Sequence, residues 1–143
     1  MSQHNVLFVC LGNICRSPMA EALARAYGSD VIRARSAGLT PAISTSPLTR
    51  TVLKEKNIEL GDHLPRSIRD ISLDGVDLIV NMSGRKLPVE TAVPILDWKV
   101  KDPIGGSQTV YQEVCAQLEM LVMQLILQLR TGKFDYRATA RAK

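Results

Sequence analysis

Residues 5–18 read NVLFVCLGNICRSP, an apolar run that ends at Cys10 and leads through a short glycine-containing segment to Ser17-Pro18. The near-continuous apolar character of the run predicts a strand buried on both faces of a parallel sheet. Ser17 and Pro18 predict the N-cap and first turn of a helix that continues to Gly28. The stretch therefore predicts a strand, a tight loop and a helix, with Cys10 at the end of the strand.

The same alternation continues along the chain. Further strands are expected over residues 31–38, 77–82 and 92–98, a helix from Ser46-Pro47 to residue 57, and a long amphipathic helix over residues 107–130. The order βαβαβαβα predicts an α/β single domain, a four-stranded parallel sheet with helices on both faces and a phosphate-binding loop after the first strand. We expect this domain to cover residues 1–132, followed by a flexible basic C-terminal tail over residues 133–143.

Composition limits the function classes. The chain has 143 residues, 45% of them hydrophobic, with a formal charge of +4, three cysteines and two histidines. An odd cysteine count does not fit a fully paired disulfide framework, and the spacing does not match a zinc site, so the cysteines are expected to be thiols. The basic residues are scattered and aromatics are few, which argues against nucleic acid. With neither a signal peptide nor a membrane span expected, we predict a cytoplasmic protein that does not bind membranes.

The loop after the first strand is the expected ligand site, because open parallel sheets bind ligands outside the carboxyl ends of their strands. If residues 11–16 wrap into a cradle, their N–H groups converge on one point beside the positive end of the following helix. Arg16 at the rim can hold two oxygens of a phosphate with its planar guanidinium. The sequence of this cradle is Leu11, Gly12, Asn13, Ile14, Cys15 and Arg16.

Cys10 is expected on the floor of the same cradle. The positive field there favours thiolate over thiol, and a thiolate beneath a bound phosphate is a nucleophile aimed at phosphorus. Gly12 and Asn13 suit a tight cradle because glycine permits positive φ and asparagine tolerates the left-handed region. Ser17 is expected to cap the helix and to donate its hydroxyl towards the sulfur.

Asp102 is the candidate general acid. A phosphate monoester with a poor leaving group needs a proton on its bridging oxygen as the P–O bond breaks. The segment WKVKDPIGGS follows the fourth predicted strand, so Asp102 is expected at the same sheet edge as Cys10, with Pro103 restricting its backbone. Taken alone, an aspartate before a proline is more typical of an ordinary turn; the cradle at the same sheet edge favours the general acid.

The stretch CLGNICRSPMAEA resembles the active-site loop of the low-molecular-weight protein tyrosine phosphatases, which read C-x5-R-S near the N-terminus. The resemblance covers residues 5 to about 131. It implies that Cys10 is the nucleophile, that Arg16 binds phosphate and that Asp102 is the general acid. It further implies a hydrolase that acts on a phosphorylated protein, most simply on phosphotyrosine, through a phosphocysteine intermediate, with inorganic phosphate as product and with no metal or cofactor.

The resemblance also implies a supporting shell in which Asn13 is linked by hydrogen bonds to Ser36 and His63. Without the resemblance, His63 reads as an exposed or internally satisfied histidine. For Cys15 the resemblance suggests a reversible disulfide with Cys10 that protects the nucleophile from further oxidation. Packing within the loop is the alternative for Cys15.

The substrate is left open by two departures from the tyrosine phosphatases. Ile104, Gly105 and Ala42 stand where those enzymes carry aromatic residues around the phosphotyrosine ring, and DPIGGS is similar to the acid loop of the protein-arginine phosphatases. The arginine phosphatases, however, resemble CTGNTCRS in the cradle, with threonine at the position of Ile14. Isoleucine at that position favours phosphotyrosine.

Two other functions remain. Thioredoxin-coupled arsenate reductases need two more cysteines after the third strand, where this chain reads NMSGRKL, so only a reductase coupled to an external thiol stays open. A phosphate-binding module without turnover has no use for the acid Asp102.

Overall fold

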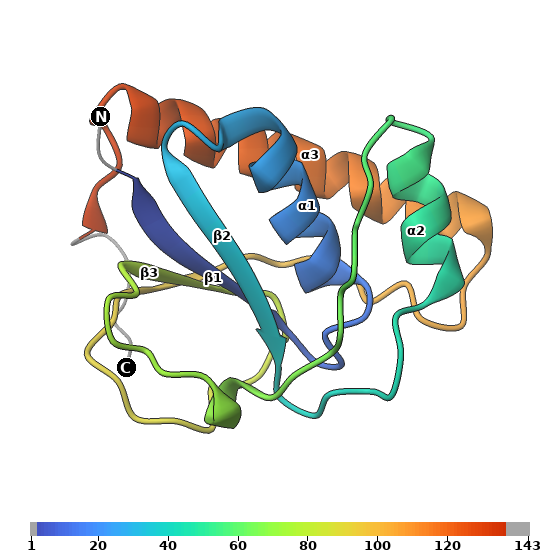
Figure 1. Ribbon diagram of the computed structural model, residues 1–143, viewed down its shortest axis with the longest axis horizontal. Helices are drawn as coiled ribbons and strands as arrows, with labels where there is room; N and C mark the ends of the chain where they lie inside the picture. The colour runs from blue at the N-terminus through green and yellow to red at the C-terminus, as the bar shows by residue number, and fades with distance from the viewer. Residues whose placement is uncertain (1–2, 137–143) are drawn as a thin grey trace.

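The computed structural model describes residues 3–136, which form one α/β domain (Figure 1). Its elements in chain order are β1 (His4–Cys10), α1 (Arg16–Gly28), β2 (Ile32–Gly38), α2 (Pro47–Lys54), the 3-10 helix η1 (Ile68–Asp70), β3 (Leu78–Asn81), β4 (Ile95–Asp97) and α3 (Gln108–Arg130). The four predicted strands are confirmed.

The sheet is parallel throughout, in the order β2-β1-β3-β4. Cys10 pairs in register with Gly38 of β2, and Val9 pairs with Asn81 of β3. The carboxyl ends of β2, β1 and β3 therefore lie side by side at one edge of the sheet. This edge carries the loop that follows Cys10.

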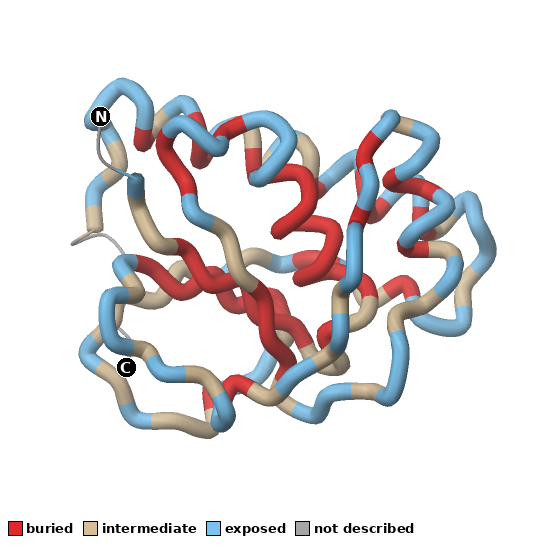
Figure 2. The backbone as a smooth tube through the Cα atoms, viewed as in Figure 1, coloured by how far each residue is buried: buried red, intermediate tan, exposed pale blue. Residues whose placement is uncertain are grey.

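The α-helices gather on one face of the sheet. Helix α1 packs against β1, β2 and α3, and α2 packs against α3 and α1 (Figure 1). The buried residues concentrate in the strands and on the inward sides of these helices (Figure 2). The opposite face carries a smaller apolar cluster that includes Leu7, Val9 and Ile79, and it is covered by Ile68 of η1 and by irregular segments with Leu73, Leu87 and other aliphatic residues. The predicted α/β class with a four-stranded parallel sheet is confirmed; of the helices predicted on both faces, the α-helices lie on one face and only the 3-10 helix η1 lies on the other.

The predicted alternation is wrong between β3 and β4, where residues 82–94 form no helix. Gly84, Pro88 and Pro94 interrupt this segment, and proline removes the backbone donor that a helix interior needs. Instead, Asn81 accepts from the N–H and the hydroxyl of Ser83, which fixes a tight turn directly after β3.

Helix α3 is long and apolar enough, by length and composition alone, to cross a membrane. This differs from the expectation that no segment approaches a membrane span. Its apolar character is explained by packing, because Tyr111, Cys115, Leu118, Val122 and Ile126 are buried in the core of the domain. The helix has the features of a central core helix.

The first residues of the predicted tail pack against the domain. Phe134 and Tyr136 are half-buried, and their rings meet edge to face. The Tyr136 hydroxyl lies 2.6 Å from Nδ1 of His4, and burial raises the pKa of Tyr136 to about 12. Aromatic side chains bury large apolar areas, which accounts for their packing beyond residue 132. The rest of the predicted tail lies outside the described residues, so the domain boundary stays a prediction.

Candidate active site

The loop after β1 presents its carbonyl oxygens outwards. The carbonyls of Cys10, Leu11 and Gly12 accept from the N–H groups of Leu39, Thr40 and Ala42 at 2.8–3.1 Å. Those of Asn13 and Ile14 accept from His63 Nε2 and Thr49 Oγ1, at 2.8 and 2.7 Å. Because the C=O and N–H of a peptide unit point in opposite directions, the N–H groups of residues 11–15 face the inside of the loop. The loop therefore has the backbone geometry expected of the predicted anion cradle.

Asn13 provides the left-handed turn of the cradle. Its φ is 57°, as the sequence allows, whereas Gly12 does not adopt the positive φ that glycine permits. Hydrogen bonds of the Asn13 side chain offset the cost of this backbone conformation. Nδ2 donates to Ser17 Oγ and Ser36 Oγ at 2.8 and 3.0 Å, and Oδ1 accepts from the N–H of Arg66 at 3.0 Å. A buried side chain with three such contacts fixes the loop.

Gly38, rather than Gly12, is the glycine that the close packing of the cradle requires. A Cβ on Gly38, at the end of β2, would lie 2.7 Å from the Leu11 carbonyl oxygen and 2.8 Å from the Asn13 nitrogen. Only glycine allows β2 and the loop to approach this closely. In the sequence, the only signal for this position is the strand-ending SAG, which does not distinguish a packing role from a turn.

Cys10 lies buried on the floor of the cradle, with its Sγ 3.0 Å from Ser17 Oγ. The Ser17 hydroxyl accepts from Asn13, so its single proton is left for the sulfur or for the Ala37 carbonyl at 3.3 Å. Ser17 is not the N-cap that the sequence predicts. Helix α1 begins two residues earlier than predicted, at Arg16, with Cys15 at the N-cap position, and the Ser17 side chain contacts Cys10 instead of capping the helix.

Arg16 is buried at 5% exposure and joins three segments. One terminal nitrogen, Nη1, donates to the carbonyls of Met82 and Val100 at 2.5 and 3.1 Å, while Nη2 lies 3.4 Å from Asp102 Oδ2. The remaining donor, Nε, is buried and has no hydrogen-bond partner within the described part of the chain. An unpaired buried donor on a guanidinium is costly, so this nitrogen points to an anionic ligand that completes its bonding.

Asp102 lies where the sequence predicts it, beside Arg16 at the mouth of the cradle, with its side chain 34% exposed. Oδ1 accepts from the N–H of Ile104 at 3.1 Å. Behind it, Gly106 donates to the Pro103 carbonyl at 2.8 Å, and Gly105 has a φ of 80°. The two glycines therefore form a hydrogen-bonded turn directly after Asp102-Pro103.

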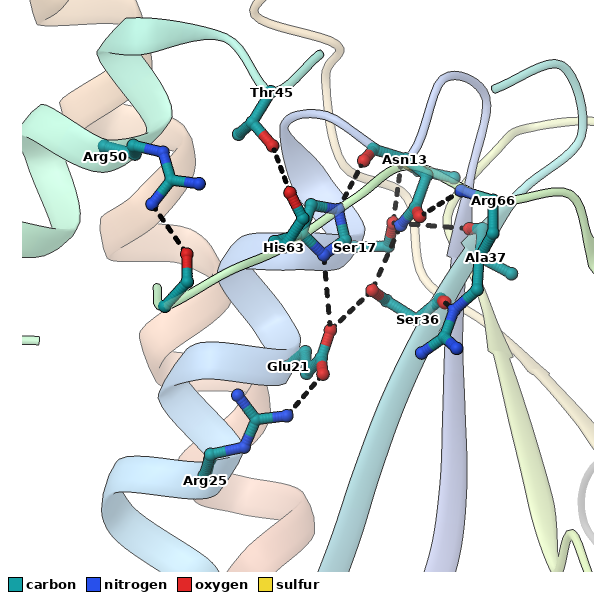
Figure 3. A network of polar contacts seen from close by, with 12 residues as sticks. Asn13, Ser17, Glu21, Arg25, Ser36, Ala37, Thr45, Arg50, His63 and Arg66 are labelled. Carbon is teal, nitrogen blue, oxygen red and sulfur yellow. Dashed lines mark hydrogen bonds and ion pairs between the residues drawn. The ribbon is translucent and has the colours of Figure 1, made fainter. Parts of the chain in front are cut away.

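The polar shell around Asn13 extends further than the sequence indicates (Figure 3). Ser36 donates to the buried carboxylate of Glu21 at 2.5 Å, Glu21 also pairs with Arg25, and His63 Nδ1 lies 4.0 Å from the same carboxylate. The expected trio of Asn13, Ser36 and His63 is brought together, since His63 bonds to the Asn13 backbone. Sequence reasoning missed Glu21, whose helical position gives no sign that it is buried.

Cys15 lies in the cradle wall, buried and oriented towards α3. Its thiol donates to the Tyr111 hydroxyl at 3.5 Å, and that hydroxyl lies 2.8 Å from Ser46 Oγ. Burial raises the pKa of Cys15, so it is held as a thiol at neutral pH. All three cysteines are free.

Fold and site together define a class of protein: an α/β domain with a cysteine nucleophile candidate at the base of an anion cradle. The family model for low molecular weight phosphotyrosine protein phosphatase matches residues 5–134. The chain belongs to this family, and it is a cysteine-dependent phosphatase.

Relatives within the family carry different activities. The chain is 30% identical to the glutaredoxin arsenate reductase of Synechocystis sp., with 87% of this chain and 97% of that protein aligned. It is also 30% identical to a protein-arginine-phosphatase of Bacillus subtilis, over 90% and 99% of the two chains. The structure of a low molecular weight protein tyrosine phosphatase from T. tengcongensis is similar with a TM-score of 0.74 and 33% identity, over 89% and 100% of the two chains.

Proposed function

We propose that the protein hydrolyses phosphotyrosine in proteins through a phosphocysteine intermediate. In the first step the Cys10 thiolate attacks phosphorus in line, and the S–P bond forms as the P–O bond breaks. The electron pair of that bond passes to the tyrosine oxygen, which takes its proton from Asp102. Arg16 and the inward N–H groups of the loop stabilise the equatorial oxygens throughout.

In the second step Asp102, now a carboxylate, accepts a proton from a water molecule that attacks the phosphocysteine. The S–P bond breaks, inorganic phosphate leaves, and Cys10 returns to the thiolate. The Ser17 hydroxyl, 3.0 Å from the sulfur, is placed to donate to the thiolate as it leaves. Ser17 therefore acts on the nucleophile at both ends of the cycle.

The observation that carries this proposal is the buried, unpaired Nε of Arg16. It shares a guanidinium with Nη2, the nitrogen nearest to Asp102. A phosphoryl oxygen at Nε completes the bonding of Arg16 and brings the phosphate next to the proposed acid. A monoester bound in this way has its nucleophile, its charge stabiliser and its proton donor within one site.

Ile14 supports phosphotyrosine over phosphoarginine. Its side chain is half-buried against the core and offers no hydrogen-bonding group to a substrate. A leaving guanidinium carries several N–H donors that need acceptors when desolvated, whereas an aryl ring needs apolar contact. Ile104, exposed directly after Asp102-Pro103, adds apolar surface at the mouth of the site.

Two alternatives have support of their own. The acid loop DPIGGS and the likeness to the Bacillus subtilis enzyme favour protein-arginine phosphatase activity. The likeness to the Synechocystis protein favours reduction of arsenate with an external thiol as reductant, since residues 82–107, between β3 and α3, contain no cysteine. We also infer a cytoplasmic location, because three free thiols suit a reducing compartment.

The test is phosphate release from a phosphotyrosyl and a phosphoarginyl peptide of otherwise identical sequence, without metal or added thiol. Cys10→Ser serves as the blank. We expect Cys10-dependent turnover with a higher kcat/KM for the tyrosyl peptide. A preference for the arginyl peptide would overturn the assignment in favour of the first alternative. Activity on neither peptide, with thiol-dependent reduction of arsenate, would favour the second.

A further inference from the structure

Four cationic side chains border the proposed site on one side. Arg85 and Lys86 lie in the segment after β3, and Lys99 and Lys101 lie in the segment after β4. All four are exposed, and none forms an ion pair among residues 3–136. We call these four residues the cationic rim.

Arg16, the proposed phosphate-binding residue, contacts the backbone of both segments that carry the rim. Arg16 donates to the carbonyls of Met82 and Val100, at 2.5 and 3.1 Å. Val100 lies between Lys99 and Lys101, and Met82 precedes Arg85 by three residues. With consecutive Cα atoms about 3.8 Å apart, the Cα atoms of the rim residues lie within about 15 Å of the residues whose carbonyls touch Arg16. The two backbone segments that carry the rim therefore both lie close to Arg16.

Hydrogen bonds hold the backbone of the rim in place. The Arg85 carbonyl accepts from Asn81 Nδ2 at 2.8 Å, and the Arg85 N–H donates to Ser83 Oγ at 3.1 Å. The Lys99 carbonyl accepts from Gln117 Nε2 of α3 at 2.9 Å. The chain therefore presents these cations from fixed positions, which lowers the entropy that binding would cost.

The rim is not neutralised by its own segment. Residues 82–101 contain the four cations and two acids, Glu90 and Asp97, which leaves a net charge of +2. Asp102, the next residue, is paired with Arg16. On the other side of the cradle, residues 39–45 (LTPAIST) carry no charge, and Ile43 is almost fully exposed. Arg66, an exposed cation whose backbone N–H donates to Asn13, also lies by the cradle, so the positive charge around the site is concentrated in the rim but not confined to it.

We propose that the cationic rim binds acidic residues that flank the phosphorylated residue of a protein substrate. This inference rests on the proposed function and adds the sequence context that the enzyme selects. Because the rim lies on one side of the cradle, the acidic residues lie on one side of the phosphorylated residue. Charge complementarity of this kind steers association and depends on ionic strength.

The test uses phosphotyrosyl peptides with glutamates before the phosphorylated residue, glutamates after it, or glutamines on both sides. The same series is made with phosphoarginine, and p-nitrophenyl phosphate serves as a substrate without flanks. The enzyme variants are Arg85→Gln/Lys86→Gln and, as a control of equal charge, Lys54→Gln/Lys133→Gln, both exposed and away from the rim.

For whichever phosphorylated residue the enzyme hydrolyses, we expect one glutamate arrangement to raise kcat/KM about threefold to tenfold over the glutamine peptide, as several exposed ion pairs would. The rim variant should lose most of this preference, high salt should reduce it, and the control should keep it. Hydrolysis of p-nitrophenyl phosphate should stay the same in both variants.

Equal kcat/KM for all flanking sequences would overturn the proposed role of the cationic rim while leaving the proposed function intact. Turnover of p-nitrophenyl phosphate but of no peptide would overturn both. Single-stranded DNA, added as a competitor during p-nitrophenyl phosphate hydrolysis, tests the other class of anionic partner. If it inhibits better than an unphosphorylated glutamate peptide, and only with the rim intact, the rim is a nucleic-acid surface and the inference is wrong.

Discussion

Asp102 Oδ2 lies 3.4 Å from Nη2 of Arg16, which brings the proposed acid against the proposed phosphate-binding group. The two residues come from segments 86 positions apart and meet because β1 and β4 run parallel in one sheet. A bound phosphate would share Arg16 with Asp102. The carboxyl group then stands beside the bridging oxygen, which is the position from which a general acid must act.

Replacing Asp102 by asparagine should remove the proton donor while keeping the shape of the side chain. We expect kcat for substrates with poor leaving groups to fall by about 10²–10⁴-fold, and to fall less for p-nitrophenyl phosphate, whose leaving group needs little protonation. The measurement is the dependence of kcat on leaving-group pKa. Asp97→Asn, an exposed acid at the end of β4, is the control and should retain activity. A uniform loss across leaving groups would show that Asp102 does not act as the acid.

Replacing Asn13 by alanine should destabilise the protein far more than replacing Asn57. Asn13 and Asn57 are the two non-glycine residues with positive φ in the described chain, at 57° and 61°. Asn57 is exposed, so Asn57→Ala loses only backbone tolerance, whereas Asn13→Ala also leaves buried partners unsatisfied. We expect the free energy of unfolding to drop by about 1–3 kcal/mol more for Asn13→Ala, measured by urea denaturation. Equal losses would mean that the network around Asn13 contributes no stability.

Gly38→Ala should damage the cradle although it replaces none of the cradle residues. The added Cβ would meet two backbone atoms below 3.0 Å, so the loop must shift. We expect a loss of about 1–3 kcal/mol in stability and weaker binding of inorganic phosphate, measured by thermal shift and by competitive inhibition. Gly12→Ala is the matched comparison, because its Cβ would make an ordinary 3.4 Å contact with Ile14. Phosphate affinity that falls no further in Gly38→Ala than in Gly12→Ala would contradict the role given to Gly38.

The raised pKa of the Cys115 thiol predicts that the protein loses stability at alkaline pH. Burial raises the pKa of this thiol from its ordinary value of 9.0 to about 11. Between these values the unfolded chain releases the proton and the folded chain keeps it, so the stabilisation is complete below pH 9.0 and is lost as the pH rises towards about 11. The difference in unfolding free energy between pH 8 and pH 11 should therefore be smaller, by about 1–3 kcal/mol, in Cys115→Ala. An unchanged pH dependence would show that this thiol does not remain protonated in the folded state.

The sequence predicted the parts of the site that belong to a local pattern. Cys10 and Arg16 follow from a strand, a tight loop and a helix start within fourteen residues, and Asp102 follows from the rule that parallel strands end at one edge. The residues that support the cradle could not be predicted as well. Glu21, Arg66 and Gly38 contribute through contacts between distant segments, and no spacing in the sequence marks a buried glutamate or a glycine in close packing.

Two predictions about helices, the N-cap of α1 and a helix before β4, were wrong. Ser17-Pro18 matches a helix start, but the buried contact with Cys10 recruits the Ser17 side chain and moves the N-cap to Cys15. The alternation of strands and helices predicted a helix before β4, where two prolines and a side-chain turn at Asn81 give an irregular segment. In both places a tertiary contact or a backbone restriction overrode a pattern that is valid on average.

The most direct test of the central claim is to identify the atom that carries the phosphoryl group during turnover. Wild type and Cys10→Ser are mixed with a phosphotyrosyl peptide, quenched in acid within the first turnover, digested and examined by mass spectrometry. We predict a phosphoryl group on the wild-type peptide that contains Cys10, and neither adduct nor phosphate release with Cys10→Ser. Phosphate release by Cys10→Ser at the wild-type rate, or a phosphoryl group on another residue, would contradict the account.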